Sequence, residues 1–297
     1  MLKMNTPQQL HIPVLLTQVK RVLAPRQGES YLDLTAGYGG HANEIVLAIG
    51  DEKLATLVDR DENALKELNK KFKVAEVIHS DYLSATRELI NRGKRFDMVL
   101  LDLGVSSPQL DEAWRGFSFT NDGPLDMRMD QSQSWTAAEL VNRSSEKDLS
   151  QIIIDYGEES AKTANRIARA IRLNRPIKTT AELAKTIEST LPRSGKIHPA
   201  TRTFQAIRIA INDELNQLRL TLEILPELVN KDGRVAIITF HSLEDRIVKQ
   251  FLNERSRSGY ESDFALINKK PITASSDELV YNPRARSAKL RAAVKIK

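Results

Sequence analysis

The sequence predicts a doubly wound, Rossmann-like α/β sheet that is interrupted by an inserted all-helical domain. Short apolar runs alternate with amphipathic helical patterns from Tyr31 to Leu103, and this alternation is typical of a parallel sheet covered by helices. The alternation stops near Pro108, where only helical patterns follow, and it resumes after about residue 205. We therefore expect the α/β domain at residues 1–107 and 206–297, with the helical insert at residues 108–205.

The first part of the sheet is predicted from four apolar runs of strand length. The fourth run is apolar without interruption from Met98 to Leu101, as expected for a strand buried on both faces of a parallel sheet. Helical patterns lie between the runs, and Gly50 is a C-terminal stop for the first helix. The predicted strands are residues 31–34, 54–58, 74–78 and 96–103, and the predicted helices are residues 41–49, 62–72 and 82–91.

The insert and the second part of the sheet are predicted in the same way. Ser145 with Asp148 resembles a capping box, which marks the start of one insert helix. Pro226 predicts a kink or a boundary in the helical stretch 201–229, and Lys231-Asp-Gly predicts a turn before the next strand. The predicted insert helices are residues 137–141, 146–156, 161–173 and 181–191. The later elements are a strand at 235–240, a helix at 243–252 and strands at 264–268 and 290–296.

Composition places the chain among globular proteins and excludes several chemistries. Of its 297 residues, 41% are hydrophobic and 28% are charged, and no apolar run approaches the roughly 20 residues that cross a bilayer. The segment after Met1 has no secretory signal pattern, so we expect a cytoplasmic protein with no membrane partner. The chain has no cysteine, which excludes disulfides, thiolate zinc sites and cysteine-held iron–sulfur clusters, and we expect no metal site.

The ends of the four predicted strands carry polar or glycine residues, whereas the strand interiors do not. In an open parallel sheet, ligands bind beyond the carboxyl ends of the strands. A glycine turn from Gly37 to Gly40 follows the first strand, and Asp59 lies 22 residues after Gly37, near the spacing of a ribose-binding acid. Tyr82 follows the third strand and Asp102 ends the fourth. Together these residues predict a nucleoside-binding site.

Two residues near the turn indicate which cofactor is bound. A dinucleotide fingerprint has the form Gly-x-Gly-x-x-Gly, and Thr35 stands where many such turns have glycine. Asp33, four residues before Gly37, instead fits the acid-led glycine turn of methyltransferases. Their cofactor has no pyrophosphate to place at a helix N-terminus. The turn therefore favours S-adenosylmethionine over a nicotinamide cofactor.

Eight longer motifs are more specific than the glycine turn and run nearly from end to end. They are His11–Leu16, Asp33–His41, Leu101–Gln109, Arg115–Phe119, Gly123–Met129, His198–Arg208, Phe240–Arg246 and Arg286–Arg291. By these motifs the sequence closely resembles the bacterial 16S ribosomal RNA cytosine-N4 methyltransferases, the ribosomal RNA small subunit methyltransferase H family. The resemblance implies a Rossmann-like S-adenosylmethionine methyltransferase sheet. It also implies methyl transfer to N4 of a cytidine in the decoding centre, with 16S ribosomal RNA in the small ribosomal subunit as the partner.

The resemblance further implies a set of cofactor-binding residues. Asp59 would accept hydrogen bonds from the ribose hydroxyls, and Tyr82 would cover the adenine, although many relatives have phenylalanine there. Asp102 and Gln109 would lie near the amino-acid end of the cofactor or the methyl group. The implied cofactor residues are Gly39, Gly40, His41, Asp59, Tyr82, Asp102 and Gln109.

The expected reaction is a direct in-line attack on the methyl group, without a covalent enzyme adduct. The sulfonium methyl is already activated, so the enzyme mainly has to align the nucleophile with it. The exocyclic amine of cytosine is a poor nucleophile, and a hydrogen-bond acceptor on that amine would assist it and help to remove a proton. We expect Asp102 to orient the reacting centre, with cofactor binding alone as its alternative role. Ser106 is a second catalytic candidate.

The helical insert and the basic C-terminal strand are the expected RNA surface. From Arg284 to Lys297 the chain has six basic residues and no acidic one, which is typical of a polyanion-binding edge or of a solvated face. His241 is either a base or the start of a helix. Trp114, Phe117 and Phe119 either stack an extruded base or pack the insert against the α/β domain. The candidate RNA-binding residues are Arg128, Arg202, His241, Arg284, Arg286, Lys289 and Arg291.

Three other functions compete with this interpretation. A nicotinamide-dependent oxidoreductase is disfavoured by Thr35 and by the missing dinucleotide pattern. A non-catalytic RNA-binding assembly factor would have lost residues that bind the cofactor, whereas the cofactor residues named above are all chemically suited to that role. A DNA amino-methyltransferase would carry an Asp/Asn/Ser-Pro-Pro-Tyr turn, where this chain has Asp102-Leu-Gly-Val-Ser-Ser. Whether the protein is a monomer or a homodimer stays open.

Overall fold

The computed structural model describes residues 13–191, 198–257 and 262–297, which form two compact units. Unit 1 holds the described residues of Met1–Asp59, Asn63–Gly104 and Thr221–Lys297. Unit 2 holds the described residues of Arg60–Glu62 and Val105–Leu220. The first two residues of the motif that begins at His11 lie outside the described residues. No helix in the described ranges is long and apolar enough to cross a membrane.

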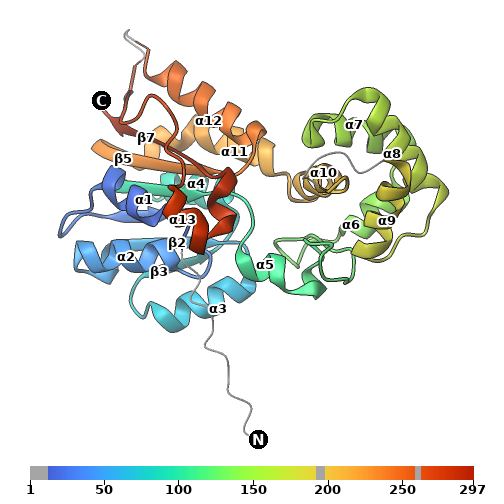
Figure 1. Cartoon of the computed structure of the whole chain (residues 1–297). Helices are drawn as coiled ribbons and strands as arrows, with labels where there is room; N and C mark the ends of the chain where they lie inside the picture. The colour runs from blue at the N-terminus through green and yellow to red at the C-terminus, as the bar shows by residue number, and fades with distance from the viewer. Residues whose placement is uncertain (1–12, 192–197, 258–261) are drawn as a thin grey trace, which may run out of the picture. The chain divides into compact units, whose positions relative to one another are not determined.

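Unit 1 is built on a seven-stranded sheet in the order β3-β2-β1-β4-β5-β7-β6 (Figure 1). The five strands from β3 to β5 are parallel, whereas β7 pairs antiparallel with both β5 and β6. The predicted doubly wound α/β sheet is therefore confirmed. Its strands are β1 (Tyr31–Asp33), β2 (Ala55–Asp59), β3 (Glu76–His79), β4 (Phe96–Asp102), β5 (Val229–Thr239), β6 (Phe264–Leu266) and β7 (Lys289–Lys295).

The order of the strands changes direction between β1 and β4. β2 and β3 lie on one side of β1, whereas β4 and β5 lie on the other side. The crevice outside the carboxyl ends of the strands at such a switch point is where doubly wound sheets bind ligands. Asp33 ends β1 and Asp102 ends β4, so two carboxylates lie at this point of the sheet.

Helices cover both faces of the sheet, because its central strands are apolar on both faces. Buried side chains of α1, α2 and α3 form one core with Leu100 of β4 and Ile238 of β5. α4 contacts β2 and α12 contacts β5, and Figure 1 shows α12 and α2 on opposite sides of the sheet. The helices of unit 1 are α1 (Leu16–Leu23), α2 (Gly40–Ile49), α3 (Glu62–Lys71), α4 (Tyr82–Asn91), α12 (Ser242–Arg255) and α13 (Ser276–Tyr281).

β5 differs from its prediction, because it is longer and contains the predicted turn. After Val229 its pairing with β4 advances five residues along β5 while β4 advances two, so three extra residues bulge from β5. Asp232, in the middle of the Lys231-Asp-Gly segment, has left-handed backbone with φ 65°. Ladder pairing continues on both sides of the bulge, and the predicted turn is therefore an irregularity within one strand.

Unit 2 consists of helices packed on one another. α7 packs against α8 and α10, and α8 packs against α9. Leu149, Ile153, Ile167 and Phe204 belong to a buried apolar core that these helices share. The helices are α5 (Ser107–Asp111), α6 (Ala137–Arg143), α7 (Glu146–Gly157), α8 (Ala161–Leu173), α9 (Thr180–Thr190) and α10 (Thr201–Asn212), with a short 3-10 turn, η2 (Ala113–Arg115), after α5.

Unit 2 extends further along the chain than the insert predicted at residues 108–205. α10 belongs to it because its apolar side chains enter the same core as those of α7 and α8. The single helical stretch predicted at 201–229 is broken at Asp213, whose left-handed backbone (φ 49°) ends α10. α11 (Glu214–Ile224) follows, and Pro226 lies in a short 3-10 turn, η3 (Leu225–Leu228), as the predicted boundary required.

Candidate functional site

The glycine turn between β1 and α2 is shaped by left-handed backbone and by close packing. Gly37 and Gly39 have φ values of 53° and 73°, which glycine adopts without the strain that a Cβ adds. A Cβ on Gly39 would lie 2.7 Å from the ring of Phe72, and one on Gly40 would overlap a proline ring. The Gly37 amide donates a hydrogen bond to the carboxylate of Asp59 at 2.7 Å. The turn is thus tied directly to the end of β2.

Four polar side chains gather at the ends of β1 and β4, and we call them the strand-end cluster: Tyr31, Asp33, His41 and Asp102. Tyr31 and Asp33 lie two residues apart on one face of β1, and the Tyr31 hydroxyl donates to the Asp33 carboxylate at 2.8 Å. The Nε2 atom of His41, in the first turn of α2, lies 3.5 Å from Oδ2 of Asp102. Tyr31, Asp33 and His41 are all buried. The cluster joins two predicted site residues, His41 and Asp102, to two that were not predicted as site residues.

Burial dominates the protonation of Asp33. Desolvation raises the pKa of Asp33 to about 6, against the opposing effects of the Tyr31 hydrogen bond and the charge of His41. Desolvation, together with the nearby charge of Asp33, also raises the pKa of Tyr31 well above its ordinary value. A cationic group bound at this place would favour the ionised form of Asp33. The cluster therefore suits a ligand that brings a positive charge.

The strand-end cluster also contains buried polar atoms that have no hydrogen-bond partner within the described chain. They are both ring nitrogens of His41 and Oδ1 of Asp102. The 3.5 Å contact between these two residues is longer than a good hydrogen bond. Buried polar groups are nearly always hydrogen-bonded in proteins, so buried atoms without a protein partner indicate a place where a ligand or a water molecule binds. These atoms, with the acids at the strand ends, fit the polar groups of S-adenosylmethionine.

Tyr82 is the first residue of α4, directly after β3. Asp81 caps this helix, because its carboxylate accepts hydrogen bonds from the amides of Leu83 and Ser84 at 3.0 and 2.9 Å. The Tyr82 side chain is buried, with 8% of the residue exposed. The cap explains why an acid precedes Tyr82, and it sets the aromatic ring at the end of the strand.

Two further predicted residues, Ser106 and Gln109, lie in unit 2 and form a capping box at the start of α5. The Ser106 hydroxyl accepts from the Gln109 amide at 3.4 Å, and the Gln109 side-chain oxygen accepts from the Ser106 amide at 3.0 Å. The Gln109 side-chain nitrogen donates to Asp61 at 2.8 Å. Helix capping accounts for the Ser106 side chain without any chemistry. The cofactor-binding role of Gln109 stays a prediction.

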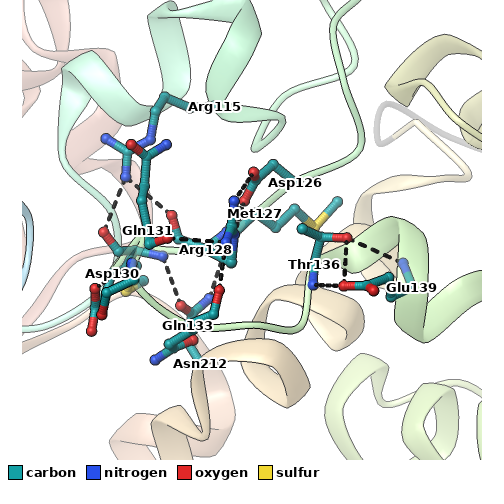
Figure 2. A network of polar contacts seen from close by, with 12 residues as sticks. Arg115, Asp126, Met127, Arg128, Asp130, Gln131, Gln133, Thr136, Glu139 and Asn212 are labelled. Carbon is teal, nitrogen blue, oxygen red and sulfur yellow. Dashed lines mark hydrogen bonds and ion pairs between the residues drawn. The ribbon is translucent and has the colours of Figure 1, made fainter.

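A second polar cluster, buried or partly buried, lies within unit 2, and we call it the loop network: Asp61, Arg115, Asp126, Arg128 and Asn212. Figure 2 shows the last four of these residues. Arg115 is 1% exposed, and its Nη1 donates to Asp61 at 2.6 Å. Its Nη2 donates to the backbone carbonyls of Arg128 and Met129, both at 3.1 Å. A single guanidinium thus holds an acid and two carbonyls of the loop that follows Asp126.

Arg128 and Asn212 complete the loop network. The Nε and Nη2 atoms of Arg128 both donate to Asp126 at 2.8 Å, a bidentate pair, and its Nη1 donates to two further backbone carbonyls. Asn212 accepts from the Met129 amide at 2.9 Å and donates to the Met127 carbonyl at 2.8 Å. Met127 has left-handed backbone with φ 61°, an unusual state for a side chain of this size. These contacts hold it there.

Five of the predicted RNA-binding residues lie beside an acid of their own unit, and the three shortest pairs are those of Arg128, Lys289 and Arg291. Arg128 pairs with Asp126, as described above. Lys289 and Arg291 both bind Asp245 of α12, at 3.1 and 2.7 Å, and Arg291 is buried. Burial raises the pKa of Asp245, but the hydrogen bonds from Arg291 and Lys289 outweigh it and hold that pKa below its ordinary value. An RNA phosphate would have to compete with these internal carboxylates.

The remaining predicted RNA-binding residues have different surroundings. Arg202 is exposed on α10 and lies 3.4 Å from a carboxylate oxygen of Glu159. Arg284 and Arg286 are exposed in a short 3-10 turn, η4 (Pro283–Ser287), before β7. His241 caps α12, because its Nδ1 accepts from the Glu244 amide at 3.4 Å. Of its two predicted roles, the helix start is therefore the one that the local contacts explain.

The three aromatic residues of the insert divide into two groups. Phe117 is buried and belongs to the apolar core of unit 2. Phe119 packs on the same core and meets the rings of His198 and Phe204 at 4.5 and 4.8 Å. Trp114 is 46% exposed, with the Arg115 guanidinium 5.2 Å from its ring centroid. Only Trp114 has the exposure that stacking on a base requires.

Two groupings of buried polar side chains went unnoticed in the sequence. Tyr31 carries a recognisable signal, because a residue two positions before Asp33 in a strand lies on the same face. The pair of Arg115 and Asp61 carries none, since 54 residues separate the two in the chain.

Comparison with known proteins identifies the family. The model of the MraW methylase family matches residues 8–296. A ribosomal RNA small subunit methyltransferase H from Acidobacterium capsulatum is 44% identical, over 96% of this chain and 98% of that protein. Its namesakes from Cyanothece sp. and Synechocystis sp. are 48% and 45% identical, over 98% and 96% of this chain and 96% and 93% of theirs. The match along nearly the whole length confirms the predicted resemblance and the cofactor S-adenosylmethionine: this chain belongs to the MraW methylase family.

Proposed function

We propose that this chain transfers a methyl group from S-adenosylmethionine to the exocyclic N4 of a cytidine in the decoding centre of 16S ribosomal RNA, within the small ribosomal subunit. One observation carries the proposal. The chain matches relatives over more than nine-tenths of their length, and the names of these relatives specify small-subunit ribosomal RNA. The lack of cysteine is consistent with this proposal and favours a nitrogen or oxygen acceptor, because methylation of a pyrimidine ring carbon through a cysteine adduct is excluded.

The strand-end cluster and the glycine turn are the proposed cofactor site in unit 1. Asp59 ends β2 and offers a carboxylate for the ribose hydroxyls. Tyr82, at the end of β3, offers a ring face for the adenine. His41 and Asp102 offer the buried polar atoms that lack partners among the described residues. Gly39 and Gly40 leave no side chain between the turn and its ligand.

The chain's own part in the reaction is alignment and proton handling. The bound cofactor supplies a methyl group that its sulfonium has already activated. Asp102 accepts a hydrogen bond from the cytosine amine, which turns the nitrogen lone pair toward the methyl group and holds the proton that leaves. Ionised Asp33 stabilises the positive charge of the cofactor before transfer. Ser106 is given no step in this mechanism, because the capping of α5, in which its hydroxyl oxygen accepts from the Gln109 amide, accounts for a serine at this position.

The proposal is tested by incubating purified small ribosomal subunits with the protein and S-adenosylmethionine, and then mapping methylated cytidine in their RNA by mass spectrometry. We expect N4-methylcytidine at a single position. The variant Asp102→Asn should lower the turnover by about 100-fold or more, in the range of a lost general base. Because the asparagine amide keeps one acceptor oxygen for the cofactor, the variant should still bind S-adenosylhomocysteine in a thermal-shift assay.

Each result has a clear opposite. Methylation at a ring carbon or a ribose would overturn the N4 assignment, and RNA binding without any methylation would point to an assembly factor. Unchanged turnover in Asp102→Asn would remove Asp102 from the chemistry while leaving the assigned reaction intact.

A further inference from the structure

α8 carries the largest excess of positive charge of any helix in the described ranges. Its sequence from Ala161 to Leu173 contains four basic residues and no acidic one. All four are exposed to solvent. They are Lys162, Arg166, Arg169 and Arg172. They lie in the insert that the sequence predicted as part of the RNA surface, but none of them is among the candidate RNA-binding residues named there.

The basic residues lie opposite the side of α8 that packs into the core. At 100° per residue, Lys162, Arg166 and Arg169 fall within a sector of about 60°, on one stripe along the helix. The buried residues point the other way and belong to the apolar core of unit 2: Ala164, Ile167, Ala168 and Ile171. We call the stripe of Lys162, Arg166 and Arg169 the α8 basic face.

The charge of the α8 basic face is not neutralised by acids among the described residues. Arg172, beside the stripe, is paired with Glu146 at 2.7 Å. Arg166 donates to the backbone carbonyl of Thr190 at 2.6 Å, a contact that leaves its charge uncompensated. Lys162 and Arg169 make no hydrogen bond or ion pair with any described residue. This face therefore differs from Arg128, whose guanidinium is bound to Asp126.

We propose that the α8 basic face binds the phosphate backbone of the RNA substrate. The inference rests on the proposed function, which supplies an RNA partner. Exposed cations on a rigid helix, without competing carboxylates, are what phosphate contacts require. Lys162 and Arg169 are about 10 Å apart along the helix, so the face is long enough to meet more than one phosphate.

An anionic membrane is the other polyanion that a basic helix can meet, and the packing of α8 argues against it. A helix that lies in a membrane surface needs a free apolar face to enter the lipid. The four buried apolar residues of α8 are used in the core of unit 2, and the one large apolar side chain that the helix exposes, Leu173, is too little to form an apolar face. Binding to a nucleic-acid backbone requires no apolar insertion, so the α8 basic face is suited to that partner.

The test compares two double variants of the full-length protein. In Lys162→Gln/Arg169→Gln, the two cations without partners are neutralised. In the matched control Lys53→Gln/Arg87→Gln, an exposed lysine and an exposed arginine of unit 1 are neutralised, so the net charge changes equally. The affinity for purified small ribosomal subunits, which carry the 16S ribosomal RNA, is measured between 50 and 200 mM salt, and methyl transfer is measured with the subunits at saturation.

We expect the slope of log affinity against log salt to be less steep by about 1.5 in the α8 variant. Each lost phosphate contact lowers the steepness of this slope by roughly 0.7–0.9, and the variant loses two contacts. The KM for RNA should rise by about tenfold, whereas kcat and the control variant should stay near wild type. Equal slopes in both variants, or binding of wild type but not of the α8 variant to phosphatidylserine vesicles, would overturn the assignment. A wild-type protein that never methylates the RNA would instead contradict the proposed function.

Discussion

The strand-end cluster of unit 1 and the loop network of unit 2 both bury charged side chains, but they satisfy them differently. In the loop network, Arg115 and Arg128 each contact an acid and two backbone carbonyls, and only Nε of Arg115 lacks a partner among the described residues. In the strand-end cluster, both nitrogens of His41 and one oxygen of Asp102 lack one. Buried polar groups stabilise a fold only when they are paired. The difference separates a structural network from a ligand site.

The largest expected effect comes from breaking the loop network. Arg115→Met removes the cation that faces the buried Asp61 carboxylate, and we expect it to lower the free energy of unfolding of unit 2 by about 3–5 kcal/mol. Both tryptophans of the chain, Trp114 and Trp135, lie in unit 2, so their fluorescence during urea unfolding reports on that unit. As a control, Arg143→Met removes an exposed pair with Glu139 and should cost less than about 1 kcal/mol. Equal losses in the two variants would contradict the structural role.

The second prediction concerns Asp33, where a substitution is expected to raise the free energy of unfolding instead of lowering it. Its pKa is about 6 in the folded protein because of burial, above the ordinary value of 3.8, so the folded state binds its proton more tightly than the unfolded state. Stability is therefore lost as the pH rises from about 4 to 6. Asp33→Asn should remove this loss and raise the free energy of unfolding at pH 7 by on the order of 3 kcal/mol, with little change at pH 4.

Asp97 is the matched control for Asp33, on the neighbouring strand β4. Burial raises the pKa of Asp97, but hydrogen bonds from Ser30 and Asn230 outweigh burial and hold that pKa below its ordinary value. Asp97→Asn should therefore destabilise the protein at pH 7, whereas Asp33→Asn stabilises it and weakens S-adenosylmethionine binding. Circular dichroism during urea unfolding and calorimetric titration measure the two effects. A loss of stability at pH 7 in both variants would remove the distinction between paired and unpaired acids.

The smallest expected effect concerns Ser106. Ser106→Ala removes the cap of α5 and should lower the free energy of unfolding by about 1 kcal/mol. Ser106→Asp offers an equivalent cap, so both stability and methyl-transfer rate should stay near wild type. Stability by urea unfolding and turnover per folded molecule check this pair. A stable Ser106→Asp protein that has lost its turnover would restore the catalytic role first expected for Ser106.

Local patterns in the sequence were sufficient for the sheet and for the strand-end acids. Alternating apolar runs predicted the parallel strands, because a buried strand must be apolar on both faces. Asp59 and Asp102 were found for the same reason, since a polar residue that ends such a run lies at the carboxyl edge of the sheet. The bulge at Asp232 was not found, because Lys231-Asp-Gly has the composition of a turn, and only its pairing with β4 makes it part of a strand.

The sequence by itself determined the class of fold, the family and the residues at the strand ends, because these depend on periodicity and on motifs of neighbouring residues. Only the tertiary structure decided which charges are already paired. Lys289 and Asp245 lie 44 residues apart in the chain, and no local pattern links them. The sequence shows which side chains are charged. Whether such a charge is available to a ligand depends on the partners that lie next to it in the folded protein.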